Sequence, residues 1–398
     1  MESIREIYRI GDGPSSSHTM APKKAAMQFL EKNPDAKGFR VTLYGSLSLT
    51  GRGHMTDVAI LSVLGSVAPT EIVWEKIFLP FHPNGMKFEA LDSEGCVVDE
   101  WTIYSIGGGA LANETIKEAP KKNVYPMNTI AQIQKWCEDS GKSYWECVEE
   151  FEGKEIWEHL NHTWTVMKSA IERGLNNEGV LPGGLGLRRK AGDYMIRAKT
   201  YGDWMRSRGM LYAYALAVSE ENASGGEIVT APTCGSCGVL PAVLFHLQNT
   251  HDFVDIRILR ALATAGLFGS VVRANASVSG AEVGCQGEVG VACAMAAAAA
   301  NQLMGGTPAQ IEYAAEMGLE HHLGLTCDPV CGLVQIPCIE RNVFAAARAV
   351  DAGMYSLFSD GKHRVTFDRT VKVMKQTGHD LPSLYKETAE GGLATIHE

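Results

Sequence analysis

The sequence predicts an α+β protein in which a mixed α/β domain precedes a larger all-helical domain. Short segments that alternate apolar and polar residues occupy 39–106, and turn signals separate them. From about residue 125, apolar residues recur at three- and four-residue intervals, which is typical of helices. A polar stretch at 117–123 lies between the two patterns. We therefore expect a β domain at 1–122 and a helical α domain at 123–398.

The β domain is expected to begin with a polar loop and a helix near Pro22. The glycine-containing stretch 45–57 predicts a loop that opens a second helix at about Thr56. Strands are predicted at 39–43, 72–81, 86–91, 96–98 and 101–106. Glycines at 107–109 end this pattern, and they lack the βαβ spacing of a dinucleotide-binding fingerprint.

In the α domain, helices are predicted at 130–137, 144–151, 156–174, 203–218, 256–272 and 289–304. The last of these is rich in alanine and is expected to be buried. Thr307, Pro308 and Gln310 predict the start of a further helix, with the threonine as its N-cap. Three carboxylates share one face of that helix, and we expect the face to be solvated rather than to hold a metal. They are Glu312, Glu316 and Glu320.

Composition limits the possible partners of this chain of 398 residues. The formal net charge of −10 argues against nucleic-acid binding, which requires a basic surface. No apolar run approaches the roughly 18 residues of a membrane-spanning helix, and residues 1–6 show no secretory signal. We therefore expect a cytoplasmic protein whose 10 cysteines serve metal binding or chemistry more than disulfides.

Two stretches concentrate cysteine among small residues. One is 275–290, where four glycines surround Cys285, and the other is 326–342, which carries Cys327, Cys331 and Cys338. A glycine-rich turn with a buried core cysteine would also explain the first stretch. The spacings are not those of zinc ribbons or ferredoxins, but they suit thiolates gathered from separate helices around iron–sulfur or zinc. Three thiolates on a four-iron cluster would leave one iron open, as a Lewis acid requires.

Two histidines lie in loops rich in glycine, serine and threonine. His18 follows Ser15, Ser16 and Ser17 before a helix start, where hydroxyls and backbone amides can hold a carboxylate. A plain N-cap with an exposed histidine fits this stretch equally well. His54 ends a second such loop, and the pair is more suggestive of function than either histidine alone. A C-x-x-C pair at Cys234 and Cys237 is a weak signal that small-residue packing explains.

Eight stretches, in order along nearly the whole chain, resemble the bacterial iron–sulfur L-serine dehydratases, in the single-chain form with a β domain before an α domain. They are GPSSSHT (13–19), GSLSLTGRGHMTD (45–57), HPNGM (82–86), YSIGGG (104–109), LPGGLGLRRKA (181–191), TAPTCGSCGVLPAVL (230–244), NASVSGAEVGCQGEVG (275–290) and GLTCDPVCGLVQIPCIERN (324–342). The last two are long and specific.

The resemblance implies a [4Fe–4S] cluster with one open iron, and no pyridoxal phosphate. Its ligands carry over to Cys285, Cys327 and Cys338, whereas Cys331 and Cys234 are not ligand positions. The chain departs from the family by having Ala21 and Met55 at positions that are often glycine, and by a short β domain. It also ends without the terminal cysteine that reaches the cluster in some members, so water, histidine or another group would occupy the open iron at rest.

The implied reaction is dehydration of L-serine to pyruvate and ammonia, a step of amino-acid degradation that feeds gluconeogenesis. His54 or His18 would be the base, and Ser15, Ser16, Ser17 and Thr19 would orient the carboxylate. L-threonine and L-cysteine are alternative substrates. A non-enzymatic iron–sulfur or zinc sensor is the alternative from another class, although it leaves the histidines without a role. A homodimer is the expected assembly.

Overall fold

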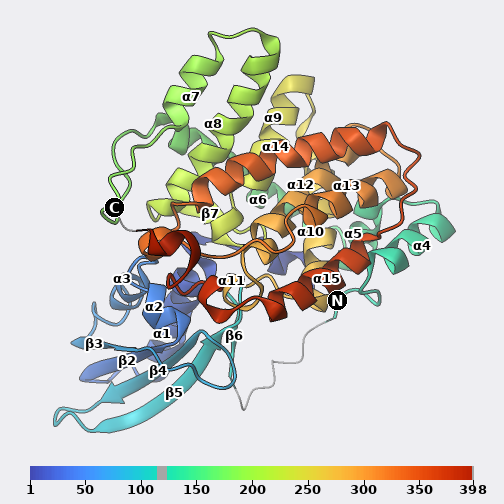
Figure 1. Ribbon diagram of the computed structural model, residues 1–398. Helices are drawn as coiled ribbons and strands as arrows, with labels where there is room; N and C mark the ends of the chain where they lie inside the picture. The colour runs from blue at the N-terminus through green and yellow to red at the C-terminus, as the bar shows by residue number, and fades with distance from the viewer. Residues whose placement is uncertain (114–122, 397–398) are drawn as a thin grey trace.

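The computed structural model describes residues 1–113 and 123–396. A small unit built on a mixed sheet, blue to cyan in Figure 1, lies against a larger helical unit. The arrangement confirms the predicted α+β class. The predicted boundary at residue 122 and nearly all of the predicted linker at 117–123 lie outside the described residues.

The N-terminal sheet has the strand order β3-β2-β4-β5-β6. β2 and β3 are parallel and are joined through α2 and α3, whereas all other pairs are antiparallel. α1 packs on the sheet, and Phe29 on that helix lies 5.5 Å from Phe88 between ring centroids. The bounds are α1 (Ala21–Lys32), β2 (Gly38–Tyr44), α2 (Ser46–Thr50), α3 (Thr56–Leu61), β3 (Thr70–Glu75), β4 (Gly85–Leu91), β5 (Val97–Ser105) and β6 (Leu111–Ala112).

Three strand predictions need correction. The predicted strand 72–81 ends at Glu75, before Pro80, which has no N–H to donate to a ladder. The predicted strands 96–98 and 101–106 form the single strand β5. The polar residues between them lie on the exposed end of this strand, and in the sequence they resemble a break. The short elements α2 and β6 carry too few residues to show a period and were not predicted.

Helices form the larger unit, and the alanine-rich α12 is its centre. α12 packs against α10, α13 and α14, and it is buried over almost its whole length, as predicted. All six predicted helices are present, whereas α7, α9, α14 and α15 were not predicted. The bounds are α4 (Ile130–Ser140), α5 (Tyr144–Glu152), α6 (Ile156–Asn176), α7 (Ala191–Ala198), α8 (Asp203–Ala223), α9 (Val239–His251), α10 (Asp255–Asn275), α11 (Gly280–Val283), α12 (Val289–Leu303), α13 (Pro308–Glu320), α14 (Cys338–Leu357) and α15 (Phe367–Asp380).

The predicted capping box at Thr307 and Gln310 is present at the start of α13. The expected solvated face of that helix is wrong, because Glu312 and Glu316 are buried beneath α15. Glu312 accepts a 2.6 Å hydrogen bond from the Phe367 N–H, one of the unpaired amides at the start of α15. Glu316 accepts one of 3.1 Å from the Thr370 hydroxyl.

The two ends of the chain connect the units. β1 (Ile10–Asp12) pairs with β7 (Glu227–Val229), and Ile4 and Tyr8 are buried in the core of the helical unit. After α15, the segment that is red in Figure 1 returns towards α2 and α3. There the Ser46 hydroxyl donates a 2.6 Å hydrogen bond to the carbonyl of Glu387. Residues from both ends of the sequence therefore meet where the units face each other.

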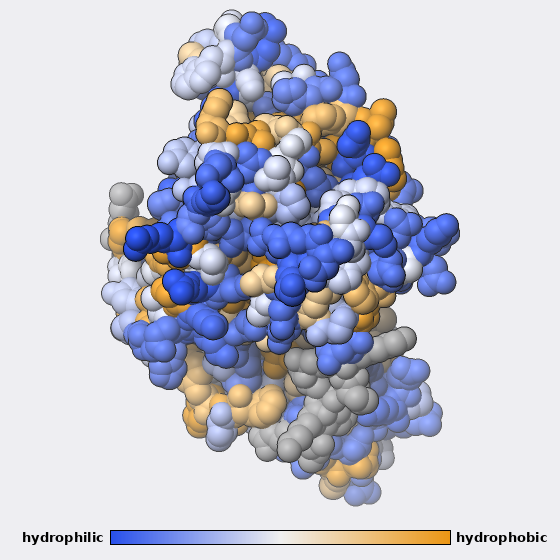
Figure 2. All heavy atoms as spheres, turned by 90° about the vertical axis from the view of Figure 1, so that its right-hand side faces the viewer, coloured by the Kyte–Doolittle hydropathy of each residue, from blue (hydrophilic) through white to orange (hydrophobic). Residues whose placement is uncertain are grey.

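Hydrophilic side chains dominate the face shown in Figure 2, and apolar side chains gather there only in patches. Across the described residues, every helix is too short or too polar to pass through a bilayer.

Candidate active site

His18 lies on η2 (Ser16–Met20), a π-helical turn that runs directly into α1. Its side chain is fully buried, and its ring nitrogens contact two hydroxyls. Nδ1 lies 2.9 Å from Ser17 Oγ, and Nε2 lies 3.2 Å from Ser46 Oγ. The Ser46 proton is already used in the bond to the Glu387 carbonyl, so Ser46 Oγ accepts from Nε2–H. His18 Nδ1 therefore carries the lone pair when the ring is neutral.

His54 follows α2 in a turn that ends at Met55, a residue with a left-handed φ of 58°. Its Nδ1 lies 2.9 Å from the carbonyl of Thr50, and a carbonyl can only accept, so Nδ1 carries the proton. Nε2 then holds the lone pair. The rings of His54 and His18 are stacked with centroids 4.5 Å apart. The two predicted histidines thus lie together. The lone pair of His54 Nε2 can accept a proton, whereas that of His18 Nδ1 accepts from the Ser17 hydroxyl.

Glu387 reaches both histidines from the C-terminal segment. Its Oε1 lies 3.4 Å from His18 Nδ1 and 3.6 Å from His54 Nε2, the two nitrogens that hold lone pairs. The backbone of Glu387 has a left-handed φ of 60°, and its N–H donates to the Cys327 carbonyl at 2.8 Å. Within the described residues, these three side chains form the one group of ligand-type atoms that lie within 4.8 Å of one another.

Burial sets the charge state of this group. Desolvation lowers the pKa of His54 to about 4, and it lowers that of His18 well below its usual range, with the neighbouring His54 contributing. Both rings are therefore neutral near pH 7. Burial raises the pKa of Glu387 well above its usual range, and the nearby Glu288 acts in the same direction. A neutral imidazole, which holds a lone pair, is the form that a general base requires.

The serine loop surrounds His18 as the sequence predicts, but much of its hydrogen-bonding capacity is used within the protein. Ser15 Oγ accepts from the His18 N–H at 3.1 Å and lies 3.4 Å from Ser17 Oγ. The Thr19 hydroxyl donates to the His54 carbonyl at 2.7 Å and accepts from the Ser15 N–H at 3.2 Å. Burial raises the pKa of the Cys234 thiol well above its usual range, and a hydrogen bond with Ser16 acts in the opposite direction. Thr19 thus connects the two histidine loops.

The cysteines Cys285, Cys327 and Cys338 come from three separate elements. Cys285 begins η4 (Cys285–Gly287) just before α12, Cys327 follows the turn after α13, and Cys338 opens α14. Cys285 and Cys327 are buried, and Cys338 is partly buried. Burial is the largest cause of a raised pKa in each thiol, and it brings Cys285 to about 11. For Cys327 and Cys338, the charges of the other cysteines raise the pKa further.

Arg341 supplies positive charge to this cysteine group. It lies on α14, and its Nη1 donates to the Thr326 carbonyl at 2.7 Å, which attaches the Cys327 loop to that helix. Nη2 lies 3.2 Å from Asp328 Oδ1. Burial works to lower the pKa of Arg341, but the charges of Cys285 and Cys338 contribute to a net increase. An arginine in this position favours thiolates, the form that binds metal.

The three cysteines fit a cluster better than a single zinc ion. Four thiolates around one zinc have sulfur atoms ~3.8 Å apart, given Zn–S bonds of about 2.3 Å. The three sulfur atoms do not form a group within 4.8 Å in the part of the chain that the structure describes. Gly280 keeps space beside them, because a Cβ there would lie 3.2 Å from Cys327 Sγ. Wider thiol spacing and this open space suit a multi-iron cluster.

Three other cysteines that the sequence singles out differ from these candidate ligands. Cys331 is exposed and has a left-handed φ of 54°. Cys234 and Cys237 are buried and free, as small-residue packing predicts. Cys234 Sγ donates to Met20 Sδ at 3.4 Å.

Sequence reasoning missed several side chains of the site. The loop at 82–86 faces it, since His82 contributes to the lowered pKa of His18 and lies 3.5 Å from Glu282 of α11. Nearby buried polar groups have no hydrogen-bond partner within the described residues and are available to a ligand; they include Asn84, Ser105 and Ser279. Glu387 and Arg341 were also missed.

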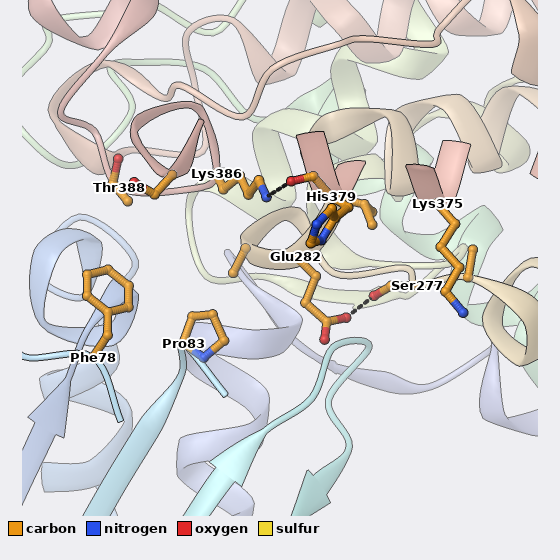
Figure 3. Close-up of a pocket in the computed structure, with 12 residues that line it drawn as sticks. Phe78, Pro83, Ser277, Glu282, Lys375, His379, Lys386 and Thr388 are labelled. Carbon is orange, nitrogen blue, oxygen red and sulfur yellow. Dashed lines mark hydrogen bonds between the residues drawn. The ribbon is translucent and has the colours of Figure 1, made fainter. Parts of the chain in front are cut away.

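A pocket of about 450 Å³ opens beside the site, between the two units (Figure 3). Phe78 and Pro83 line it from the sheet unit, and Glu282 lines it from α11. Lys386 and Thr388 also line it, whereas Glu387 between them contacts the histidines. The C-terminal segment therefore separates the pocket from the histidine pair.

Comparison with known proteins finds family models that match both parts of the chain. The family model described as "Serine dehydratase beta chain" matches residues 3–77, and the one described as "Serine dehydratase alpha chain" matches residues 63–394. The chain belongs to the serine dehydratase family. Within it, the histidines come from the beta-chain part, and the cysteines and Glu387 come from the alpha-chain part.

Members of the family resemble this chain over its whole length. A protein of Haemophilus influenzae named L-serine dehydratase is 40% identical, with 99% of each chain covered. One of Streptomyces coelicolor with the same name is 41% identical over 98% of each chain. L-serine dehydratase 2 of Escherichia coli is 41% identical, over 99% of this chain and 98% of its own.

Proposed function

We propose that this protein is an L-serine ammonia-lyase that dehydrates L-serine to pyruvate and ammonia, using a [4Fe–4S] cluster and no pyridoxal phosphate. The observation that carries the proposal is that Glu387 connects two neutral imidazoles with a group of three cysteines. Its backbone binds the Cys327 loop and its side chain contacts both rings. The names of the similar proteins support L-serine as the substrate.

Cys285, Cys327 and Cys338 would hold the cluster, and Arg341 would stabilise their thiolates. When bound, a cluster with three protein ligands supplies an open iron that acts as a Lewis acid on the 3-hydroxyl of the substrate. The three cysteines come from separate elements, and this explains why their spacing in the sequence resembles no short metal motif.

His54 would remove the Cα proton. Its Nδ1–H is fixed on the Thr50 carbonyl, so Nε2 is the accepting atom and the ring cannot turn without losing that bond. A positioned base contributes about 10²–10⁴-fold to rate. His18 Nδ1 faces the same point and is the alternative base.

The serine loop would orient the substrate carboxylate. The Ser15 and Ser17 hydroxyls lie 3.4 Å apart, a spacing that two oxygens of a carboxylate can bridge. Ser16 and Thr19 would act by shaping this loop, since Ser16 lies beside Cys234 and the Thr19 hydroxyl donates to the His54 carbonyl.

The chemistry balances with residues of this chain and water alone. His54 Nε2 takes the Cα proton, the C3–O bond breaks, and the leaving hydroxyl receives that proton from the His54 imidazolium and departs as water. The resulting 2-aminoacrylate tautomerises to an imine, which water hydrolyses to pyruvate and ammonia. We further propose a cytoplasmic homodimer, because twofold dimers are the commonest oligomers of soluble proteins.

Anaerobic purification tests this proposal. Iron and sulfide would be counted and pyruvate formation from L-serine assayed on one sample, before and after exposure to air. We expect about four irons per chain and activity that air abolishes. A full cluster without serine turnover would redirect the assignment to L-threonine or L-cysteine, which a kcat/KM comparison would decide. Zinc in place of iron would refute the mechanism.

A further inference from the structure

We propose that Glu387 receives the α-ammonium group of the substrate and thereby makes the site selective for amino acids. This inference rests on the proposed function, and it supplies what that function leaves open. The serine loop would hold the carboxylate and the cluster would act on the hydroxyl, but neither recognises the amine. A side chain that does so must be acidic, buried at the site and free to accept hydrogen bonds.

Glu387 meets these three requirements. Its residue is only 4% exposed, and its Oε2 has no hydrogen-bond partner within residues 1–113 and 123–396. Its Oε1 lies near the two histidine rings, which are neutral and supply no positive charge. A buried carboxyl oxygen without a partner is rare in proteins, because desolvation then goes uncompensated. An ammonium group, with three N–H donors, would satisfy it, and its positive charge would favour the carboxylate form that burial alone disfavours.

The position also suits the reaction. Glu387 Oε1 lies 3.4 Å from His18 Nδ1 and 3.6 Å from His54 Nε2, the atoms that can accept a proton. In an amino acid the nitrogen is bonded to Cα at about 1.5 Å. An ammonium held by Glu387 therefore leaves the Cα–H bond within reach of an imidazole.

The charges around Glu387 impose one orientation on a zwitterion. Besides burial, Glu288 acts on the Glu387 carboxyl as a second acidic group that raises its pKa, and the backbone amide of Ala281 acts in the opposite direction. A substrate carboxylate is repelled from this side and turns towards the Ser15 and Ser17 hydroxyls. The ammonium group is attracted to it.

A structural role for Glu387 is served by its backbone. Its N–H donates to the Cys327 carbonyl, and its own carbonyl accepts from Ser46. Replacing the carboxylate by an amide leaves both bonds intact. The backbone at this non-glycine residue has a left-handed φ of 60°, and the side chain lies towards the histidines.

Binding to the anaerobic holoenzyme tests the proposal without relying on turnover. L-alanine and propionate both carry a carboxylate and no hydroxyl, but only L-alanine has an ammonium group. Isothermal titration would compare wild type, Glu387→Gln and Glu390→Gln, after iron has been counted in each. Glu390 is an exposed acid on the same segment and is the matched control.

We expect Glu387→Gln to weaken L-alanine binding by about 10- to 100-fold, the effect of a lost charge-assisted hydrogen bond. Propionate binding should change less than about twofold, and Glu390→Gln should change neither. Equal weakening of the two ligands, or no weakening, would overturn the proposal. If Glu387→Gln loses its iron, Glu387→Asp carries the test, since a retained acid should preserve the preference for L-alanine.

Failure of the proposed function has a different signature. Wild type that neither binds L-alanine nor forms pyruvate from L-serine would refute that function, and with it this inference. Wild type that forms pyruvate, with a Glu387→Gln variant that still prefers L-alanine, would refute the ammonium site alone.

Discussion

Two regions of the molecule bury acidic side chains, and the regions differ in the hydrogen bonds that these side chains accept. Beneath α15, Glu312 and Glu316 accept hydrogen bonds from the Phe367 N–H and the Thr370 hydroxyl. At the candidate active site, Glu387 Oε2 has no such partner among the described residues. Burial raises the pKa in both regions, to about 7 for Glu312 and Glu316 and well above the usual range for Glu387.

The difference teaches that a raised pKa alone does not identify a functional site. Desolvation shifts any buried acid, whether its role is structural or chemical. What separates the two regions is whether the protein itself completes the hydrogen bonds. The pair beneath α15 stabilises the packing of two helices, whereas Glu387 keeps an oxygen for another molecule. The comparison predicts that variants in the first region lose stability and variants in the second lose activity.

The largest effect is expected for Cys327→Ser. Removing one thiolate ligand should release the cluster and lower kcat/KM at least ~10³-fold, because the Lewis acid is lost. Iron content and pyruvate formation would be measured together. Cys331→Ser is the matched control, since Cys331 is exposed and lies only four positions along the chain. Retained iron and activity in Cys327→Ser would contradict the ligand assignment.

His54→Ala should lower kcat by about 10²–10⁴-fold while iron content is retained, because it removes a base and no ligand. The matched variant is His363→Ala in the first region, where His363 Nε2 lies 2.8 Å from Glu312. That variant should lose stability and keep its kcat. Steady-state kinetics and urea unfolding on both proteins would check the pair. A His54→Ala enzyme with full kcat would transfer the role to His18.

Glu312→Ala should reduce the free energy of unfolding by about 1–3 kcal/mol, because the Phe367 N–H is left without its buried acceptor. We expect kcat to change less than about twofold. Chemical denaturation of the iron-loaded protein gives the first quantity, and Glu312→Gln, which keeps an acceptor oxygen, should cost less. A large fall in kcat with unchanged stability would reverse the comparison.

The final prediction is a pH dependence of stability in the first region. Glu312 and Glu316 have a pKa of about 7 in the folded protein, above the ordinary 4.5, so the folded state binds their protons more tightly. Their contribution is therefore present below pH 4.5 and is lost as pH rises towards and through 7. The Glu312→Gln/Glu316→Gln double variant should lack this loss. The free energy of unfolding of both proteins would be measured at pH 5, 6 and 7. If the expectation is wrong, this free energy will change with pH equally in the two proteins.

Periodicity predicted the parts of the fold that depend on local sequence. α12 follows from its alanine-rich apolar pattern, and the capping box at Thr307 follows from residue types that act on their own neighbours. Strand ends were less predictable, since β5 continues through exposed polar residues that resemble a turn. Short elements such as α2 carry too few residues to show a period.

The site was predictable where residue type and local composition carry the signal. His18 and His54 stood out by their glycine- and serine-rich loops, and the structure places their rings 4.5 Å apart. Glu387 carries no local signal, because its role depends on a chain reversal that brings the C-terminal segment to Ser46. The same limit explains Glu312 and Glu316, since an i, i+4 pattern of acids looks the same whether or not a later helix covers it.

The most direct test of the central claim is Mössbauer spectroscopy of the ⁵⁷Fe-loaded protein with and without L-serine. If three cysteines hold a four-iron cluster and one iron acts on the substrate, about a quarter of the iron signal should shift when L-serine binds. Unshifted iron during turnover of L-serine, or turnover by protein without iron, would contradict the account.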